Sequence, residues 1–185
     1  MKSKKAAKLV LIFPLVGILA LTIYQSNVFL KLDGNKVVNS NFDRLDLPEF
    51  QFYDLSNNLI TNRQFLKGRS LVLIHVDTSC DLCSNKIKSL LKYIDLFEKT
   101  DIILSSSEDK NALESFYESN KLHLYPQIFL VQSRSGFFYE KFGSSFIPLI
   151  LVFNEDGVLV KKIDDLVPIG TIIKYIKIAN NEEIE

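Results

Sequence analysis

The stretch HVDTSCDLCSNKIKSLLKYI, residues 75–94, decides the fold because it contains both cysteines of the chain, Cys80 and Cys83. A continuous apolar run, SLVLIHV, ends inside its first two residues and predicts a buried strand. After the cysteines, apolar residues recur every three or four positions, which predicts an amphipathic helix to about Lys99. The residues on its apolar face are Cys83, Ile87, Leu90, Leu91, Ile94 and Phe97.

The junction of strand and helix gives the two cysteines different surroundings. Cys83 falls on the buried face of the helix, whereas Cys80 falls at its tip, where free backbone N–H groups and the helix dipole favour a thiolate. Cysteines three positions apart in a first helical turn can also form a disulfide with little backbone movement. An exposed nucleophile beside a sheltered resolving cysteine is the arrangement that thiol–disulfide exchange requires.

The sequence after residue 46 alternates between strand and helix patterns. Strands are expected at EFQFYD (49–54), SLVLIHV (70–76), DIILSSS (101–107) and in the hairpin PLILVFNEDGVLVKKI (148–163), and helices at DKNALESFYESN (109–120) and 169–178. NNLITNRQFLKG (57–68) is expected to form a turn and a short helix, and KLHLYPQIFLVQSRSG (121–136) an irregular segment. This order predicts an α/β fold, a mixed sheet flanked by helices on both faces.

The N-terminal sequence predicts a membrane anchor. Four lysines in residues 1–8 precede the apolar run LVLIFPLVGILALTIY, residues 9–24. By the positive-inside rule, 1–8 form a cytoplasmic basic tip and 9–24 an uncleaved transmembrane helix, with a cleaved signal peptide as the alternative. Residues 25–46 then form a tether, 47–178 an extracytoplasmic domain and 179–185 an acidic tail. In that compartment a cysteine pair can be oxidised.

Charge and ligand counts argue against two other functions. After residue 24 the chain has 18 basic and 22 acidic side chains, because four of its 22 Lys and Arg residues come earlier. Without a basic stripe, no nucleic-acid partner is expected. A closed zinc site needs four ligands, and only His75 and His123 could join the cysteines, so no metal is expected. A purely structural disulfide is a further alternative, although so small a loop gains little chain entropy.

The motif CDLC (80–83) at a strand-to-helix junction, together with FGSSFIPLILVFNEDGVLVKK (142–162), resembles the thioredoxin superfamily. The nearest branch is the membrane-anchored redoxins of the TlpA and ResA type, which share a peroxiredoxin-like (AhpC/TSA-related) core, and the resemblance covers about residues 47–178. It implies a thioredoxin-like fold without a cofactor. It also implies that Cys80 attacks, that Cys83 resolves by forming the disulfide Cys80–Cys83, and that Ile147–Pro148 is a cis pair that docks the substrate.

Three positions depart from the family pattern. Ser79 and Leu82 stand where the family has tryptophan and proline beside the cysteines, and Ile74 replaces a buried acidic or amide residue. These changes favour a non-catalytic binding module with a vestigial or structural cysteine pair.

Few ionisable side chains are close to the motif in the sequence. Asp77 and His75 are the nearby groups that could move a proton, although a histidine on an apolar strand is typically a core residue. Asp81 places a negative charge beside Cys80. Asp77 and Asp81 are therefore the residues predicted to tune the thiol chemistry.

The intact cysteine pair and Ile147–Pro148 favour an enzyme, a membrane-tethered, extracytoplasmic thiol–disulfide oxidoreductase that reduces disulfides, in the bacterial periplasm. Its predicted partners are extracytoplasmic client proteins with disulfides, an electron donor in the membrane or periplasm, and the membrane itself through the anchor.

Overall fold

A seven-stranded mixed sheet runs through the part of the chain that the computed structural model describes, residues 46–65 and 67–183. The strand order is β2-β1-β5-β4-β3-β6-β7. The strands are β1 (Gln51–Asp54), β2 (Leu59–Thr61), β3 (Ser70–His75), β4 (Thr100–Ser106), β5 (Ile128–Gln132), β6 (Leu149–Phe153) and β7 (Leu159–Ile163). The central strands β3, β4 and β5 are parallel, and the other neighbouring pairs are antiparallel.

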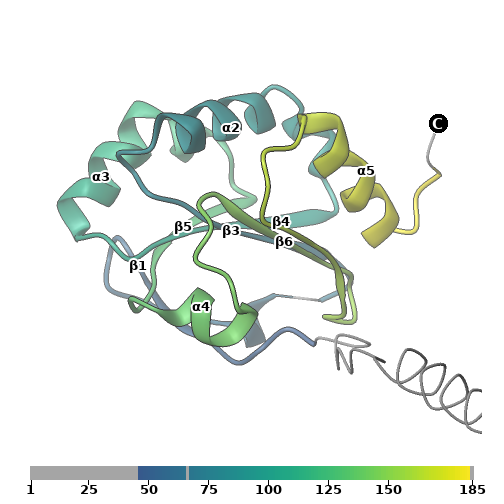
Figure 1. Ribbon diagram of the computed structural model, residues 1–185, viewed down its shortest axis with the longest axis horizontal. Helices are drawn as coiled ribbons and strands as arrows, with labels where there is room; N and C mark the ends of the chain where they lie inside the picture. The colour runs from purple at the N-terminus through teal and green to yellow at the C-terminus, as the bar shows by residue number, and fades with distance from the viewer. Residues whose placement is uncertain (1–45, 66, 184–185) are drawn as a thin grey trace, which may run out of the picture. The chain divides into compact units, whose positions relative to one another are not determined.

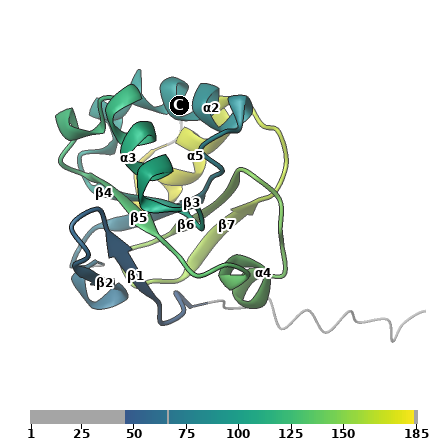
Figure 2. The same cartoon turned by 90° about the vertical axis from the view of Figure 1, so that its left-hand side faces the viewer.

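Helices cover both faces of this sheet, as the sequence predicted (Figure 1). The helices α2, α3 and α5 lie on one face, and the short helix α4 lies on the other, an arrangement that is also visible in the turned view of Figure 2. Their bounds are α2 (Asp81–Leu91), α3 (Lys110–Ser119), α4 (Phe137–Phe142) and α5 (Ile169–Ala179). The described residues belong to one compact unit, 44–185.

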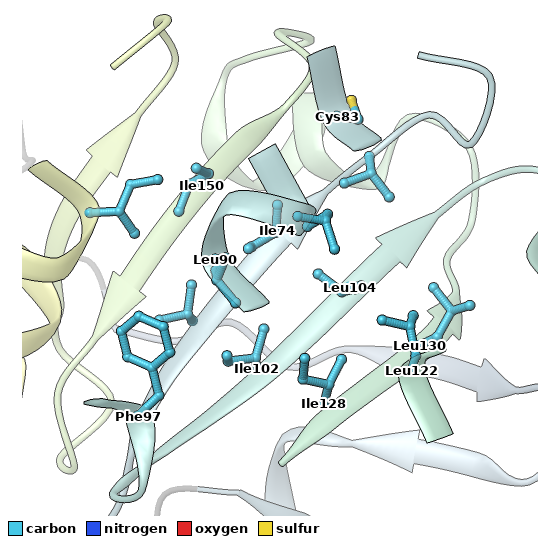
Figure 3. Packing of buried hydrophobic residues seen from close by; sticks show 14 of the residues in the cluster. Ile74, Cys83, Leu90, Phe97, Ile102, Leu104, Leu122, Ile128, Leu130 and Ile150 are labelled. Carbon is cyan, nitrogen blue, oxygen red and sulfur yellow. The ribbon is translucent and has the colours of Figure 1, made fainter. Parts of the chain in front are cut away.

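The alternation of side chains along β3 divides the core into two clusters. Val72 and Ile74 face α2, α3 and α5, whereas Leu71 and Leu73 face α4, and all four are fully buried. Both faces of this central strand are covered, which explains why its sequence is apolar without interruption. Figure 3 shows the cluster on the side of α2, α3 and α5, with Cys83 in the first turn of α2 above the sheet.

The helix after the cysteines is shorter than its apolar pattern predicts. It ends at Leu91 instead of continuing to about Lys99, and a separate 3₁₀ helix, Ile94–Phe97, follows. The break lies at Tyr93, whose φ of −117° and ψ of 20° are not helical. The apolar spacing continues across the break because Ile94 and Phe97 still pack on the same core cluster.

Two strands differ from the expectation. The segment 121–136, expected to be irregular, contains a 3₁₀ helix at Leu122–Leu124 and the strand β5, which lies between β4 and β1. The segment 57–68, expected to form a turn and a short helix, contains the edge strand β2 before a 3₁₀ helix at Asn62–Gln64. The sheet is therefore wider than the sequence pattern indicates.

The predicted C-terminal hairpin is confirmed. Strands β6 and β7 pair antiparallel, and Gly157 in the turn has a φ of 78°, a conformation that favours glycine. Asn154 Oδ1 accepts a hydrogen bond from the backbone N–H of Val158 at 2.9 Å, which closes the turn. Strand β6 of the hairpin also pairs with β3. The first residues of β6 therefore lie beside the loop between β3 and α2, residues 76–80, which contains Cys80 and is called the cysteine loop below.

No helix among residues 46–65 and 67–183 is long and apolar enough to cross a membrane. The predicted basic tip and anchor, and the predicted tether up to residue 45, lie outside the described residues.

Candidate active site

The two cysteines lie where β3 leads into α2. Cys80 caps the helix N-terminus, and its Sγ accepts a hydrogen bond from the backbone N–H of Cys83 at 3.2 Å. Both are free thiols; Cys80 is half-buried, whereas Cys83 is fully buried. The structure therefore brings together an accessible sulfur and a sheltered one, and the disulfide between them remains a prediction for the oxidised protein.

Cys83 is held as a neutral thiol by its surroundings. Burial in the core beneath α2 raises its pKa to about 12, and the neighbouring Cys80 sulfur adds to this effect. Only a small fraction of Cys83 is therefore ionised at neutral pH. Because the thiolate is the nucleophile, the proton of Cys83 must be removed before this residue can attack a disulfide.

Asp77 is bound within the loop between β3 and α2. Its Oδ1 accepts hydrogen bonds from the Ser79 hydroxyl at 2.6 Å and from the Ser79 backbone N–H at 2.8 Å. These bonds hold the pKa of Asp77 below its usual value, so the carboxylate is ionised and a weak base at neutral pH. Its charge raises the pKa of Cys83, whereas its backbone N–H lowers it. Asp77 thus acts on the ionisation of Cys83.

His75 does not reach the cysteines. Its ring stacks on Phe138 with centroids 4.1 Å apart, and its Nδ1 lies 3.1 Å from the Ser105 carbonyl oxygen. Phe138 belongs to the core on the α4 face, whereas Cys83 belongs to the core on the α2 face. Burial lowers the pKa of His75, so it is neutral at pH 7. His75 is therefore a core histidine, as its place on an apolar strand predicted, and it is not placed to move a proton for the cysteines.

The peptide bond between Ile147 and Pro148 is cis, as predicted. Pro148 is buried and directly precedes Leu149, which pairs with His75 across β6 and β3. The proline therefore lies at the same end of the sheet as the cysteine loop. Ile147 and Cys80 also pack against the same core cluster. Substrate docking by these residues remains a prediction.

The two residues between the cysteines face solvent. Asp81 is exposed at the first position of α2, and the Leu82 side chain is 53% exposed. An exposed leucine beside a half-buried sulfur is available to a docking protein, and Asp81 contributes a negative charge to the same surface.

Glu108, which no local sequence pattern links to the cysteines, also contacts the cysteine loop. Its Oε2 accepts a hydrogen bond from the backbone N–H of Thr78 at 2.6 Å. The two residues are 30 positions apart, so only the pairing of β3 with β4 brings them together. No local motif could have predicted this contact.

A groove of about 220 Å³ lies between the cysteine loop and α3. Its lining is rich in hydroxyl groups and consists of Thr78, Ser79, Ser84, Ala112, Ser115, Phe116 and Ser119. Two of these residues, Thr78 and Ser79, belong to the loop that leads to Cys80, whereas Cys80 itself does not line the groove.

Solved structures show which fold this geometry belongs to. A secreted Mycobacterium tuberculosis disulfide oxidoreductase homologous to DsbE of E. coli is 15% identical with a TM-score of 0.59, covering 70% of this chain and 95% of that one. The thioredoxin domain of a Bacteroides vulgatus thiol-disulfide oxidoreductase is 18% identical with a TM-score of 0.59, covering 71% and 95%.

A peroxiredoxin-like protein from Aquifex aeolicus is 13% identical with a TM-score of 0.59, covering 72% of this chain and 85% of that one. No family model and no curated protein matches the sequence. The likeness in structure establishes that the chain has a thioredoxin fold, which confirms the resemblance found in its sequence at the level of the fold.

Proposed function

We propose that the chain is a thiol–disulfide oxidoreductase of the TlpA and ResA type that reduces disulfides in extracytoplasmic client proteins. The observation that carries this proposal is the asymmetry of the cysteine pair, with Cys80 half-buried at a helix N-terminus and Cys83 fully buried behind it. The solved structures that share the fold include thiol-disulfide oxidoreductases, which supports redox chemistry in general.

The proposed reaction has two exchange steps. The Cys80 thiolate attacks a client disulfide, which forms a mixed disulfide and releases one client thiolate. The Cys83 thiolate then attacks Cys80 Sγ, which forms the Cys80–Cys83 disulfide and releases the second client thiolate. Two electrons pass to the client, and a dithiol donor in the membrane or periplasm returns the pair to its reduced form.

Substitution of the resolving cysteine tests the proposal directly. In Cys83→Ser the second step is blocked, so client proteins should accumulate as mixed disulfides on Cys80 that dithiothreitol releases. Cys80→Ser is the matched control, because it retains Cys83 but removes the accessible nucleophile. A Cys83→Ser protein that forms no adduct with any membrane-associated or extracytoplasmic protein would contradict exchange chemistry.

The proposed location rests on the N-terminal sequence. With residues 1–8 in the cytoplasm and 9–24 in the membrane, a reporter fused after Glu185 should be active only outside the cytoplasm. A mature chain that begins near residue 25 would replace the tethered protein with a secreted one.

A non-catalytic binding module is the second candidate, and the site offers a specific observation in its favour. Cys83 has a raised pKa, and Asp77, the carboxylate that acts on it, is a weak base that is already hydrogen-bonded. Little Cys83 thiolate is therefore present at neutral pH for a resolving attack. A cysteine pair that stays reduced at all physiological potentials, together with no client adduct, would favour this module.

A further inference from the structure

We propose that Glu108 is a positioning residue for the resolving step: it holds the loop between β3 and α2 in the conformation that places Cys80 Sγ beside Cys83. This inference rests on the proposed function, because it concerns the attack of Cys83 on Cys80. Glu108 lies in the loop that follows β4, so it acts on the cysteines from a different part of the chain.

The backbone N–H groups of residues 76–80 show what holds the loop. Most of them bond within the loop and α2 or continue the strand pairing. Val76 donates to the Ser105 carbonyl at 2.8 Å and continues the strand pairing. Ser79 donates to Asp77 Oδ1 at 2.8 Å, and Cys80 donates to the Asp77 carbonyl at 3.2 Å. The Thr78 N–H donates to Glu108 Oε2 at 2.6 Å. Of the side chains that accept these hydrogen bonds, Asp77 belongs to the loop itself, whereas Glu108 comes from a distant part of the chain.

Glu108 is itself fixed to the sheet. Its Oε2 accepts a hydrogen bond from the hydroxyl of the buried Ser106 at 3.0 Å, and its own N–H donates to that hydroxyl at 3.2 Å. Its carbonyl oxygen accepts from Gln132 Nε2 in β5 at 2.7 Å. The carboxylate therefore connects Thr78 to the end of β4, and the main-chain carbonyl of the same residue is held by β5. A hydrogen bond to a charged acceptor is stronger than a neutral one.

The position of Thr78 matters because it lies between Asp77 and Cys80. Asp77 acts on Cys83 in two opposite ways, through an N–H that favours the thiolate and a carboxylate that opposes it. If the Thr78 N–H loses its acceptor, the loop can turn and change this balance as well as the path of Cys83 to Cys80 Sγ. Small displacements of reacting groups have large effects on rate.

The test is a resolution assay that needs no client. Stoichiometric 5,5′-dithiobis(2-nitrobenzoate) converts Cys80 of the full-length protein to a mixed disulfide, and Cys83 then displaces the second thionitrobenzoate, which is followed by absorbance. In Glu108→Ala this second phase should slow by about tenfold, because the loop loses a charge-assisted hydrogen bond. In Glu108→Gln the amide oxygen can still accept from Thr78, so the rate should stay within about threefold of the wild type.

Glu118→Ala is the matched control, because Glu118 is an exposed glutamate of α3 and has no side-chain hydrogen bond or ion pair in the described part of the chain. It should resolve at the wild-type rate. Amide hydrogen exchange is a second measurement, which remains informative if Glu108→Ala is less stable. Exchange at Thr78 should accelerate in Glu108→Ala more than exchange at the strand residue Val72, whereas a general loss of stability would accelerate both.

Wild-type resolution in a folded Glu108→Ala, or unchanged protection of Thr78, would overturn the inference. A reagent-driven resolution that depends on Glu108, in a protein that traps no client, would instead retain this inference and reject the proposed function.

Discussion

The rate at which Cys83 resolves a mixed disulfide should rise steeply with pH well beyond the range of an ordinary thiol. In the reduced protein, burial and the neighbouring Cys80 raise the pKa of Cys83 to about 12. In a mixed disulfide the Cys80 sulfur is bonded to the second sulfur, so the effect of its thiol hydrogen bond and of its charge is lost, but burial is the largest cause and remains. The pKa of Cys83 therefore stays above its usual value, and the thiolate fraction should grow about tenfold for each pH unit.

Between pH 7 and pH 10 the resolution rate should therefore increase about a thousandfold. A thiol with a pKa near 8.5 would gain only about thirtyfold over the same range and level off above about pH 9. The assay is the release of thionitrobenzoate from Cys80 at each pH. The same adduct in Cys83→Ser, measured in parallel, subtracts direct attack by hydroxide. A plateau below pH 9 would refute the argument that burial keeps Cys83 neutral.

Three further outcomes are expected. Asp81→Asn removes a negative charge beside the Cys80 thiolate, so the reduction potential of the cysteine pair should become about 10–20 mV more oxidising in redox titrations. A more reducing potential would contradict repulsion between Asp81 and the thiolate. Ile87→Ala, at a fully buried position of α2, should lower the free energy of unfolding by about 3 kcal/mol in denaturant titrations, whereas the exposed Lys88→Ala should change it little. Folding raises the pKa of Cys83, so the stability that this thiol contributes is complete below its unfolded pKa, about 8.5, and is lost as pH rises toward about 12. Reduced wild type should therefore lose about 2 kcal/mol more than Cys83→Ala between pH 8 and pH 10 in denaturant titrations.

The strand before the cysteines and the helix after them could be predicted because packing on the core determines which of their positions are apolar. β3 is apolar without interruption since both faces are covered, and the three-to-four spacing after Cys80 follows from one buried helix face. The same spacing concealed the end of α2 at Leu91, because the 3₁₀ helix after it continues to pack on the core.

Other features depend on pairing between segments that are distant in the sequence, and the spacing of apolar residues does not indicate such pairing. β5 follows a proline and a 3₁₀ helix, and its strand conformation is determined by β4 and β1 on its two sides. The contact of Glu108 with Thr78 exists only because β3 and β4 end side by side. The pattern around His75 identified a candidate for proton transfer, but the face of β3 on which it lies separates it from the cysteines.

Because Cys83 is buried in the core on the α2 face, the redox equilibrium of the cysteine pair is coupled to the folding equilibrium of the protein. The difference in unfolding free energy between the dithiol and disulfide forms equals the difference in reduction potential between the unfolded and folded pair, with about 30 mV for each 1.4 kcal/mol. Any core residue that packs differently around Cys83 in the two forms therefore changes the potential. Ile87 and Leu90, which share this cluster, can act on the redox balance from the interior of the protein without approaching a client.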